Sequence, residues 1–108
     1  MKKHINSSPL TKRLLIEMGE NLRMARLRRN LSIRVIAERV GVSVNTIVSL
    51  ETGSSGVSIG VAANVLHALG LSEDIKHIAK DDSFGRILQD MKLMPRKKAT
   101  KKTPLKNP

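Results

Sequence analysis

The apolar residues of this chain recur at helical spacing, and short polar or glycine-containing stretches separate the runs. The first run places four apolar residues on one face of a helix: Leu14, Met18, Leu22 and Ala25. Ser8-Pro9 precedes this run, and proline is tolerated in the first turn of a helix, so we expect the helix to begin there. It should run to about Arg29, with Asn30 as its C-terminal stop.

Four shorter helices are predicted after the first one. Serine is a good N-cap because its side chain accepts a free backbone N–H, and glycine adopts the left-handed conformation that ends a helix. The expected caps are Ser32, Ser43, Ser58 and Ser72, and the expected stops are Gly41, Gly53 and Gly70. The residues expected to face the core are Ile36, Ala37 and Val40, then Ile47 and Leu50, then Ile59, Ala62, Ala63, Leu66 and Leu69, and lastly Ile75, Ile78 and Ala79.

The remainder of the chain divides into a short amphipathic segment and a basic tail. Asp81-Asp82-Ser83 interrupts the helical pattern. The next apolar residues again have the spacing of a helix face: Phe84, Ile87, Leu88 and Met91. From Pro95 onward the chain is rich in Lys, Arg, Thr, Pro and Asn, and we predict that it is disordered, because it cannot bury enough apolar surface to offset its ordering entropy. This tail is interpreted as a solvated end, a clamp on the DNA backbone or a contact for a partner.

Composition narrows the fold and function classes. The chain has 108 residues, which suits one small domain with a tail, and it lacks Cys, which excludes disulfides and thiolate metal sites. A single aromatic residue argues against a sheet sandwich or barrel, so we predict an all-α fold. No apolar stretch is long enough for a transmembrane helix or a secretory signal, so we expect a cytoplasmic protein without membrane contact.

Charge is distributed unevenly along the chain. The net charge is +11, divided as +7 over residues 1–35, −3 over residues 36–91 and +7 over residues 92–108. Such a balance points to a polyanionic partner, with nucleic acid favoured over an anionic membrane surface. No Lys or Arg lies between Arg39 and Lys76, so positive charge near a binding surface must come from the tail or from four arginines: Arg23, Arg28, Arg34 and Arg39.

Residues 33–52 form the most specific motif. Ala37 is followed by Gly41 and then by Ile47, and we expect Ala37 to be small because the third helix crosses close over it. Gly41 permits the left-handed backbone that the turn needs. Ile47 and Leu50 anchor the third helix from behind, so its other face projects outward. This is helix-turn-helix geometry, in which the second helix of the pair enters the major groove of DNA.

The outward face of the third helix is the candidate surface for base contacts. The Asn45 amide can pair with adenine N6 and N7, and Val44 can contact a thymine methyl group. Thr46, near the helix start, can reach a phosphate. The residues predicted on this face are Ser43, Val44, Asn45, Thr46, Ser49 and Thr52. The competing interpretation is a solvated polar face on an ordinary helix of a bundle.

Residues 20–80 resemble the Cro/C1-type (XRE) helix-turn-helix family, which implies a compact five-helix bundle. The resemblance rests on three stretches: Asn21-Leu22-Arg23 through Ser32, Glu51-Thr52-Gly53, and Leu66 through Leu71. It implies an ion pair between Glu51 and Arg26. The family often has Gln just after the cap of the second helix, making a phosphate contact. Here that place is Ile33, so either Arg34 takes over the role or the contact is missing.

The end of the fold resembles a narrower group. Residues 82–88, followed by Leu93-Met94-Pro95-Arg96-Lys97, resemble HipB-like antitoxins, which repress their own operon and bind a HipA-type kinase toxin. The expected function is a homodimeric repressor that binds double-stranded DNA at an inverted repeat, as the antitoxin of a type II toxin-antitoxin system. The alternatives are a stand-alone repressor and a protein-docking module without DNA specificity.

The predicted division of the chain follows from these patterns. Residues 1–9 are a flexible N-terminus, residues 10–80 the helix-turn-helix domain, residues 81–94 a short amphipathic extension and residues 95–108 the disordered Lys-rich tail. The three His residues have no spacing that makes a metal-ligand set, and no Ser/His/Asp set is evident. We therefore expect no enzymatic activity, no metal and no cofactor.

Overall fold

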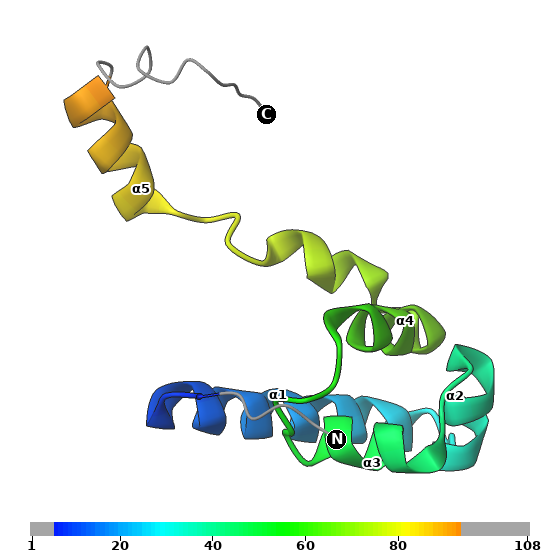
Figure 1. Cartoon of the computed structure of the whole chain (residues 1–108). Coiled ribbons are helices and arrows are strands. Elements are labelled where there is room, and N and C mark those ends of the chain that lie inside the picture. Colours follow the sequence, from blue (N-terminus) through cyan, green and yellow to red (C-terminus); the bar gives the residue numbers. More distant parts are fainter. Residues whose placement is uncertain (1–5, 94–108) are drawn as a thin grey trace. The chain divides into compact units, whose positions relative to one another are not determined.

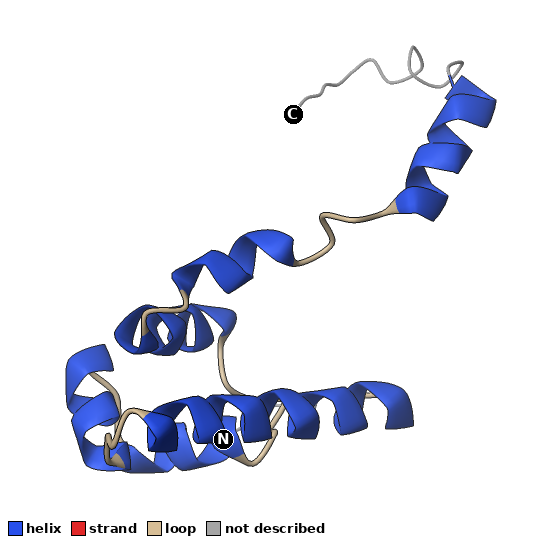
Figure 2. Cartoon of the chain, turned by 180° about the vertical axis from the view of Figure 1, so that it is seen from behind, coloured by secondary structure: helices blue, strands red, loops and turns tan. Residues whose placement is uncertain are grey.

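The computed structural model of the chain describes residues 6–93, and within them it contains helices and loops but no strand (Figures 1 and 2). The chain divides into two compact units, with the boundary between Ile75 and Lys76. The predicted disordered tail lies outside the described residues, as do the first five residues of the predicted flexible N-terminus. The all-α prediction is confirmed.

The helices of the first unit begin at, or directly after, the serines at which the sequence predicted them to start. They are α1 (Pro9–Arg28), α2 (Ile33–Val40), α3 (Val44–Glu51), α4 (Ile59–Leu69) and a 3₁₀ helix (Ser72–His77) that crosses the unit boundary. At the start of each α-helix a serine Oγ accepts the backbone N–H three residues on; these serines are Ser8, Ser32, Ser43 and Ser58. Asn30 has a φ of 53°, consistent with its predicted place at the end of α1.

A small core holds the first four helices together. Its buried apolar members are Leu22, Ala25, Ile36, Ala37, Ile47, Leu50, Val65 and Leu69. In Figure 1, α3 runs alongside α1. The two helices approach closely because Gly19 of α1 has no side chain: a Cβ there would lie 2.5 Å from the carbonyl oxygen of Glu51. The contact between α1 and α3 thus depends on glycine at position 19.

The predicted apolar stripe of α1 is buried only in part, and the predicted core face of α4 is partly wrong. In α1, Leu22 and Ala25 are buried, whereas Leu14 and Met18 are exposed. In α4, Ile59 is 72% exposed, and Val65, which was not predicted to be buried, is 2% exposed. Apolar residues occupy most sides of α4, so spacing alone does not select the face that meets α2.

The predicted fifth helix differs in form and in burial. Residues Ser72–His77 form a 3₁₀ helix without a buried residue, and Ile75 is only half-buried. Ile78 and Ala79 are exposed rather than buried, and Ala79 has a φ of 60°. A left-handed residue at this position ends the helical path, so Ile78 and Ala79 do not share a helix face with Ile75.

In its described residues, the second unit contains the end of the 3₁₀ helix and one further helical segment. This segment consists of α5 (Ser83–Leu88), which confirms the predicted helix, and a π-helical turn (Gln89–Leu93) that continues it. Asp82 caps α5 by accepting the Gly85 N–H at 2.9 Å. The predicted apolar stripe of this segment is exposed along its whole length: Phe84, Ile87, Leu88 and Met91.

Candidate nucleic-acid interface

The turn between α2 and α3 sets the angle of the two helices. Gly41 ends α2 with a φ of 83°, in the left-handed region that favours glycine. The N–H groups of Gly41 and Val42 both donate to the Ala37 carbonyl, at 2.8 and 3.0 Å. Ala37 and Ile47 are buried, so the small residue and the anchor predicted for this motif both lie in the core. The helix-turn-helix geometry predicted from these residues is present.

A buried ion pair ties the end of α3 to α1. The Arg26 guanidinium donates through Nε to Glu51 Oε2 at 2.8 Å and through Nη2 to Glu51 Oε1 at 3.0 Å. Its Nη1 donates to the Leu31 carbonyl at 3.0 Å. The two side chains are 8% and 6% exposed. The pair that the family resemblance implied is therefore present, and its fork-to-fork geometry fixes α3 in direction as well as in position.

Because Arg26 is buried in this ion pair, its charge is not available to contact a nucleic acid. Hydrogen bonding to Glu51 and the charge of Glu51 raise the pKa of Arg26, although burial acts in the opposite direction. Arg29 is also engaged, since its Nη1 donates to the Ala25 carbonyl at 2.9 Å. Part of the positive charge of α1 is therefore used to build the fold.

With α3 anchored by Ile47, Leu50 and Glu51, its opposite face is left in solvent. At 3.6 residues per turn, Asn45 lies near the middle of that outward face. Asn45 is exposed, and none of the side-chain hydrogen bonds among the described residues uses its amide. Both hydrogen-bonding edges of the amide are thus available to a ligand.

The hydroxyl groups of three other predicted residues form hydrogen bonds at the ends of α3. Ser43 Oγ accepts the Thr46 N–H at 3.1 Å and lies 3.0 Å from Thr46 Oγ1. Thr52 Oγ1 donates to the Val48 carbonyl at 2.9 Å and lies 3.2 Å from the Ser49 carbonyl. The hydroxyl groups of Ser43 and Thr52 therefore serve the backbone of α3, although their oxygen atoms can still accept a hydrogen bond.

The outward face also has an apolar strip that the sequence prediction covered only in part. Val44 was predicted and is 41% exposed; Val48, one turn further along, was missed and is 39% exposed. Residues four apart lie on the same side of a helix, so the outward position predicted for Val44 was a signal for Val48. Both valines can contact thymine methyl groups.

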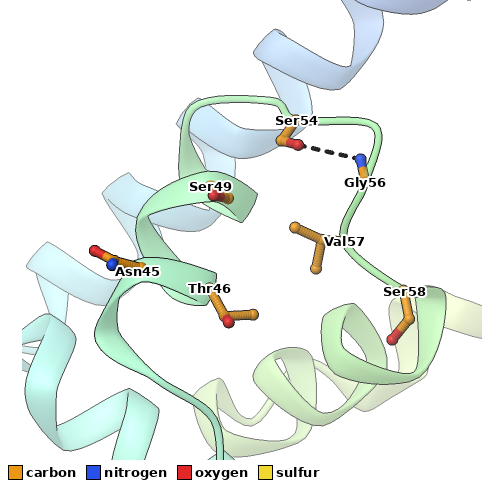
Figure 3. Close-up of a pocket in the computed structure, with 7 residues that line it drawn as sticks. All are labelled: Asn45, Thr46, Ser49, Ser54, Gly56, Val57 and Ser58. Carbon is orange, nitrogen blue, oxygen red and sulfur yellow. Dashed lines mark hydrogen bonds between the residues drawn. The ribbon is translucent and has the colours of Figure 1, made fainter. Parts of the chain in front are cut away.

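A shallow hollow adjoins the same face. Its volume is about 300 Å³, and Figure 3 shows α3 on one side and the loop before α4 on the other. The lining residues are Asn45, Thr46, Ser49, Ser54, Gly56, Val57 and Ser58. Ser54 Oγ accepts the Gly56 N–H at 3.1 Å, which shapes the loop. The structure thus brings together three predicted residues with residues 54–58, whose loop sequence has no periodic signal that places them there.

The four arginines expected to supply positive charge near the interface lie on α1 and α2. Arg34 is the second residue of α2 and is exposed, as are Arg39, Arg28 and Arg23. Arg23 forms an exposed ion pair with Glu20 at 3.4 Å, which screens part of its charge. The exposed face of α3 has polar and apolar side chains but no charged one, so cationic groups can only flank it.

Residues 6–93 contain no group of three or more His, Cys, Asp or Glu side chains arranged to hold a metal ion. Within the same residues, no helix combines the length and apolar composition that crossing a membrane requires.

Comparison with known families agrees with this geometry. A family model described as a helix-turn-helix domain matches residues 17–77, which is more than half of the 108 residues. The matched region contains the whole of α2, the turn and α3, together with Arg26. A comparison with curated proteins gives no match.

Proposed function

The chain belongs to the helix-turn-helix family, of the Cro/C1 type, whose domain suggests a DNA-binding regulator. From this premise we propose that it is a sequence-specific repressor that binds double-stranded DNA as a homodimer. Each copy places α3 in the major groove over one half of an inverted repeat. Two copies then contact half-sites about one helical turn, or a multiple of one turn, apart.

One observation carries the proposal: one face of α3 is held against the core, and the opposite face is exposed to solvent. The Arg26–Glu51 ion pair and the buried Ile47 hold the helix, while the unpaired amide of Asn45 stands on the opposite face. A fixed helix that presents an amide and methyl groups is suited to reading base edges, since bidentate amide contacts select adenine and methyl contacts select thymine.

The charge distribution supports assigning the phosphate contacts and the base contacts to different residues. Phosphate contacts position a protein without reading sequence, and they come mainly from basic side chains. Arg34 and Arg39 of α2 and Arg28 of α1 are exposed, while α3 has no Lys or Arg. We therefore assign phosphate contacts to these arginines and base contacts to Val44, Asn45 and Ser49.

A footprint on the promoter of the protein's own operon tests this function. The expected result is protection of an inverted repeat, with binding that weakens as salt is raised because phosphate contacts release counterions. A pool of random duplex DNA bound equally well, with no protected repeat, would contradict sequence-specific repression and favour the protein-docking alternative.

A narrower form of the proposal assigns the protein to a toxin-antitoxin pair. The support is the resemblance of residues 82–97 to HipB-like antitoxins, given above. The expected observation is a HipA-type kinase encoded in the same operon and co-purifying with this protein. A protected inverted repeat without such a neighbour would leave a stand-alone repressor.

A further inference from the structure

The largest apolar side chain of the chain lies outside the core. Phe84 is the one aromatic residue in the sequence, and it is 68% exposed. Ile87, Leu88 and Met91 are exposed beside it, so the stripe is continuous along α5 and the following turn. Contiguous exposed apolar surface on a small protein marks a contact site.

The helix that bears this stripe is too short to be stable unless the stripe packs against another surface. It has 6 residues in α5 and 5 in the π-helical turn, and none of the residues of α5 is buried. Isolated helices shorter than about 12–15 residues are marginal in water even when they are rich in alanine. This one contains glycine at position 85, which lowers helix propensity further.

We propose that this stripe packs in antiparallel orientation against the same stripe of a second copy of the chain. The inference deepens the homodimer of the proposed function by naming its interface. The apolar positions have a symmetric spacing, since successive members lie three, one and three positions apart along the sequence: Phe84, Ile87, Leu88 and Met91. Reversing the direction of the helix therefore keeps the pattern, so one register pairs Phe84 with the partner's Met91 and Ile87 with the partner's Leu88.

Charge selects the antiparallel orientation over the parallel one. The start of the helix carries Asp81 and Asp82, Arg86 and Asp90 follow, and its end carries Lys92. In the antiparallel register Asp82 lies near the partner's Lys92 and Arg86 near the partner's Asp90, and the two helix dipoles are opposed. Parallel packing would place the acidic ends together and the basic ends together. A methionine against an aromatic ring is also a favourable contact, and the antiparallel register supplies two.

Self-association of the full chain without DNA tests the interface, independently of any operator. The parent is expected to be a dimer at tens of micromolar protein by light scattering and sedimentation. Ile87→Asp buries a charge in the seam and should weaken the dimer at least about tenfold. Gln89→Asp is the matched control, since it adds the same charge on the opposite face, and should dimerise like the parent.

The orientation is tested by cross-linking, because the chain has no native Cys. Phe84→Cys and Met91→Cys proteins are oxidised separately and as a mixture. Antiparallel packing predicts that the mixed disulfide dominates, since a disulfide needs Cα atoms within about 7 Å and seven residues of helix span about 10 Å. Predominant Phe84→Cys homodimers would overturn the antiparallel packing.

Two further outcomes would overturn the packing against a second copy. A parent that stays monomeric at these concentrations would leave the stripe for a different protein. Equal dimerisation of the parent and Ile87→Asp would place the seam elsewhere, for example on the exposed Leu10, Leu14 and Met18 of α1. Neither result would bear on whether a footprint is found on the promoter.

Discussion

Ile47 and Phe84 are both apolar residues on short helices, yet Ile47 is 0% exposed and Phe84 is 68% exposed. The helix of Ile47 is held by a turn, a core and a buried ion pair, all supplied by its own unit. The helix of Phe84 has a cap at Asp82 but no buried neighbour within α5. The first unit therefore has a buried core of its own, whereas α5 has an apolar face and no buried residue.

The largest effect on stability should come from breaking the ion pair that holds α3. Glu51→Ala leaves the Arg26 guanidinium buried without its carboxylate, and we expect a loss of about 3–5 kcal/mol in the free energy of unfolding. Urea unfolding followed by circular dichroism measures this. Glu20→Ala is the control, because its pair with Arg23 is exposed and should be worth less than about 1 kcal/mol. Equal losses for both variants would show that the Arg26–Glu51 pair does not hold the fold.

Truncating one isoleucine to alanine in the core and one on α5 compares the same two regions. Ile47→Ala opens a cavity in the core and should cost about 2–5 kcal/mol. Ile87→Ala removes the same atoms from an exposed position and should change the unfolding of the first unit by less than about 0.5 kcal/mol. Both variants are compared by urea titration at low protein concentration, where dimerisation does not contribute. A large loss for Ile87→Ala would mean that α5 packs on the monomer core.

A pair of glycine substitutions should have opposite signs. Gly19→Ala would place a Cβ against the backbone of Glu51 and Leu50, at 2.5 and 2.7 Å from their carbonyl oxygens, and should destabilise by about 1–3 kcal/mol. At Gly60 of α4 the nearest atom to a Cβ is Ser58 Oγ at 3.8 Å, so Gly60→Ala should stabilise by about 0.5 kcal/mol through helix propensity. Thermal unfolding of the two proteins gives the sign, and a stabilised Gly19→Ala would refute the close approach of α1 and α3.

The sequence predicted helix ends better than buried faces. Ser32 and Ser43 cap the helices predicted for them, and Gly41 and Gly70 end theirs, because these contacts are local and depend on few residues. The buried face of α4 depends on which side meets α2, and an apolar helix does not specify that side. Ile59 was therefore predicted inside and lies outside.

The candidate site shows the same limit. The outward position of Asn45 follows from the anchors Ile47 and Leu50, and this part of the surface could be predicted from spacing. The Arg26–Glu51 pair joins residues 25 apart in sequence, and it was expected only through the family resemblance. Ser54 and residues 56–58 were missed as site residues because their loop has no periodicity that assigns it to a surface.

The most direct test of the account is base discrimination by Asn45. The binding constants of the parent, Asn45→Ala and the control Asn64→Ala, an exposed residue of α4, are measured on the operator, on operators changed at single base pairs and on random DNA at one salt concentration. Asn45→Ala should lose about 1–3 kcal/mol of discrimination at one base position per half-site, with little change on random DNA. Asn64→Ala should match the parent. Unchanged discrimination by Asn45→Ala would contradict the claim that the free face of α3 reads the DNA sequence.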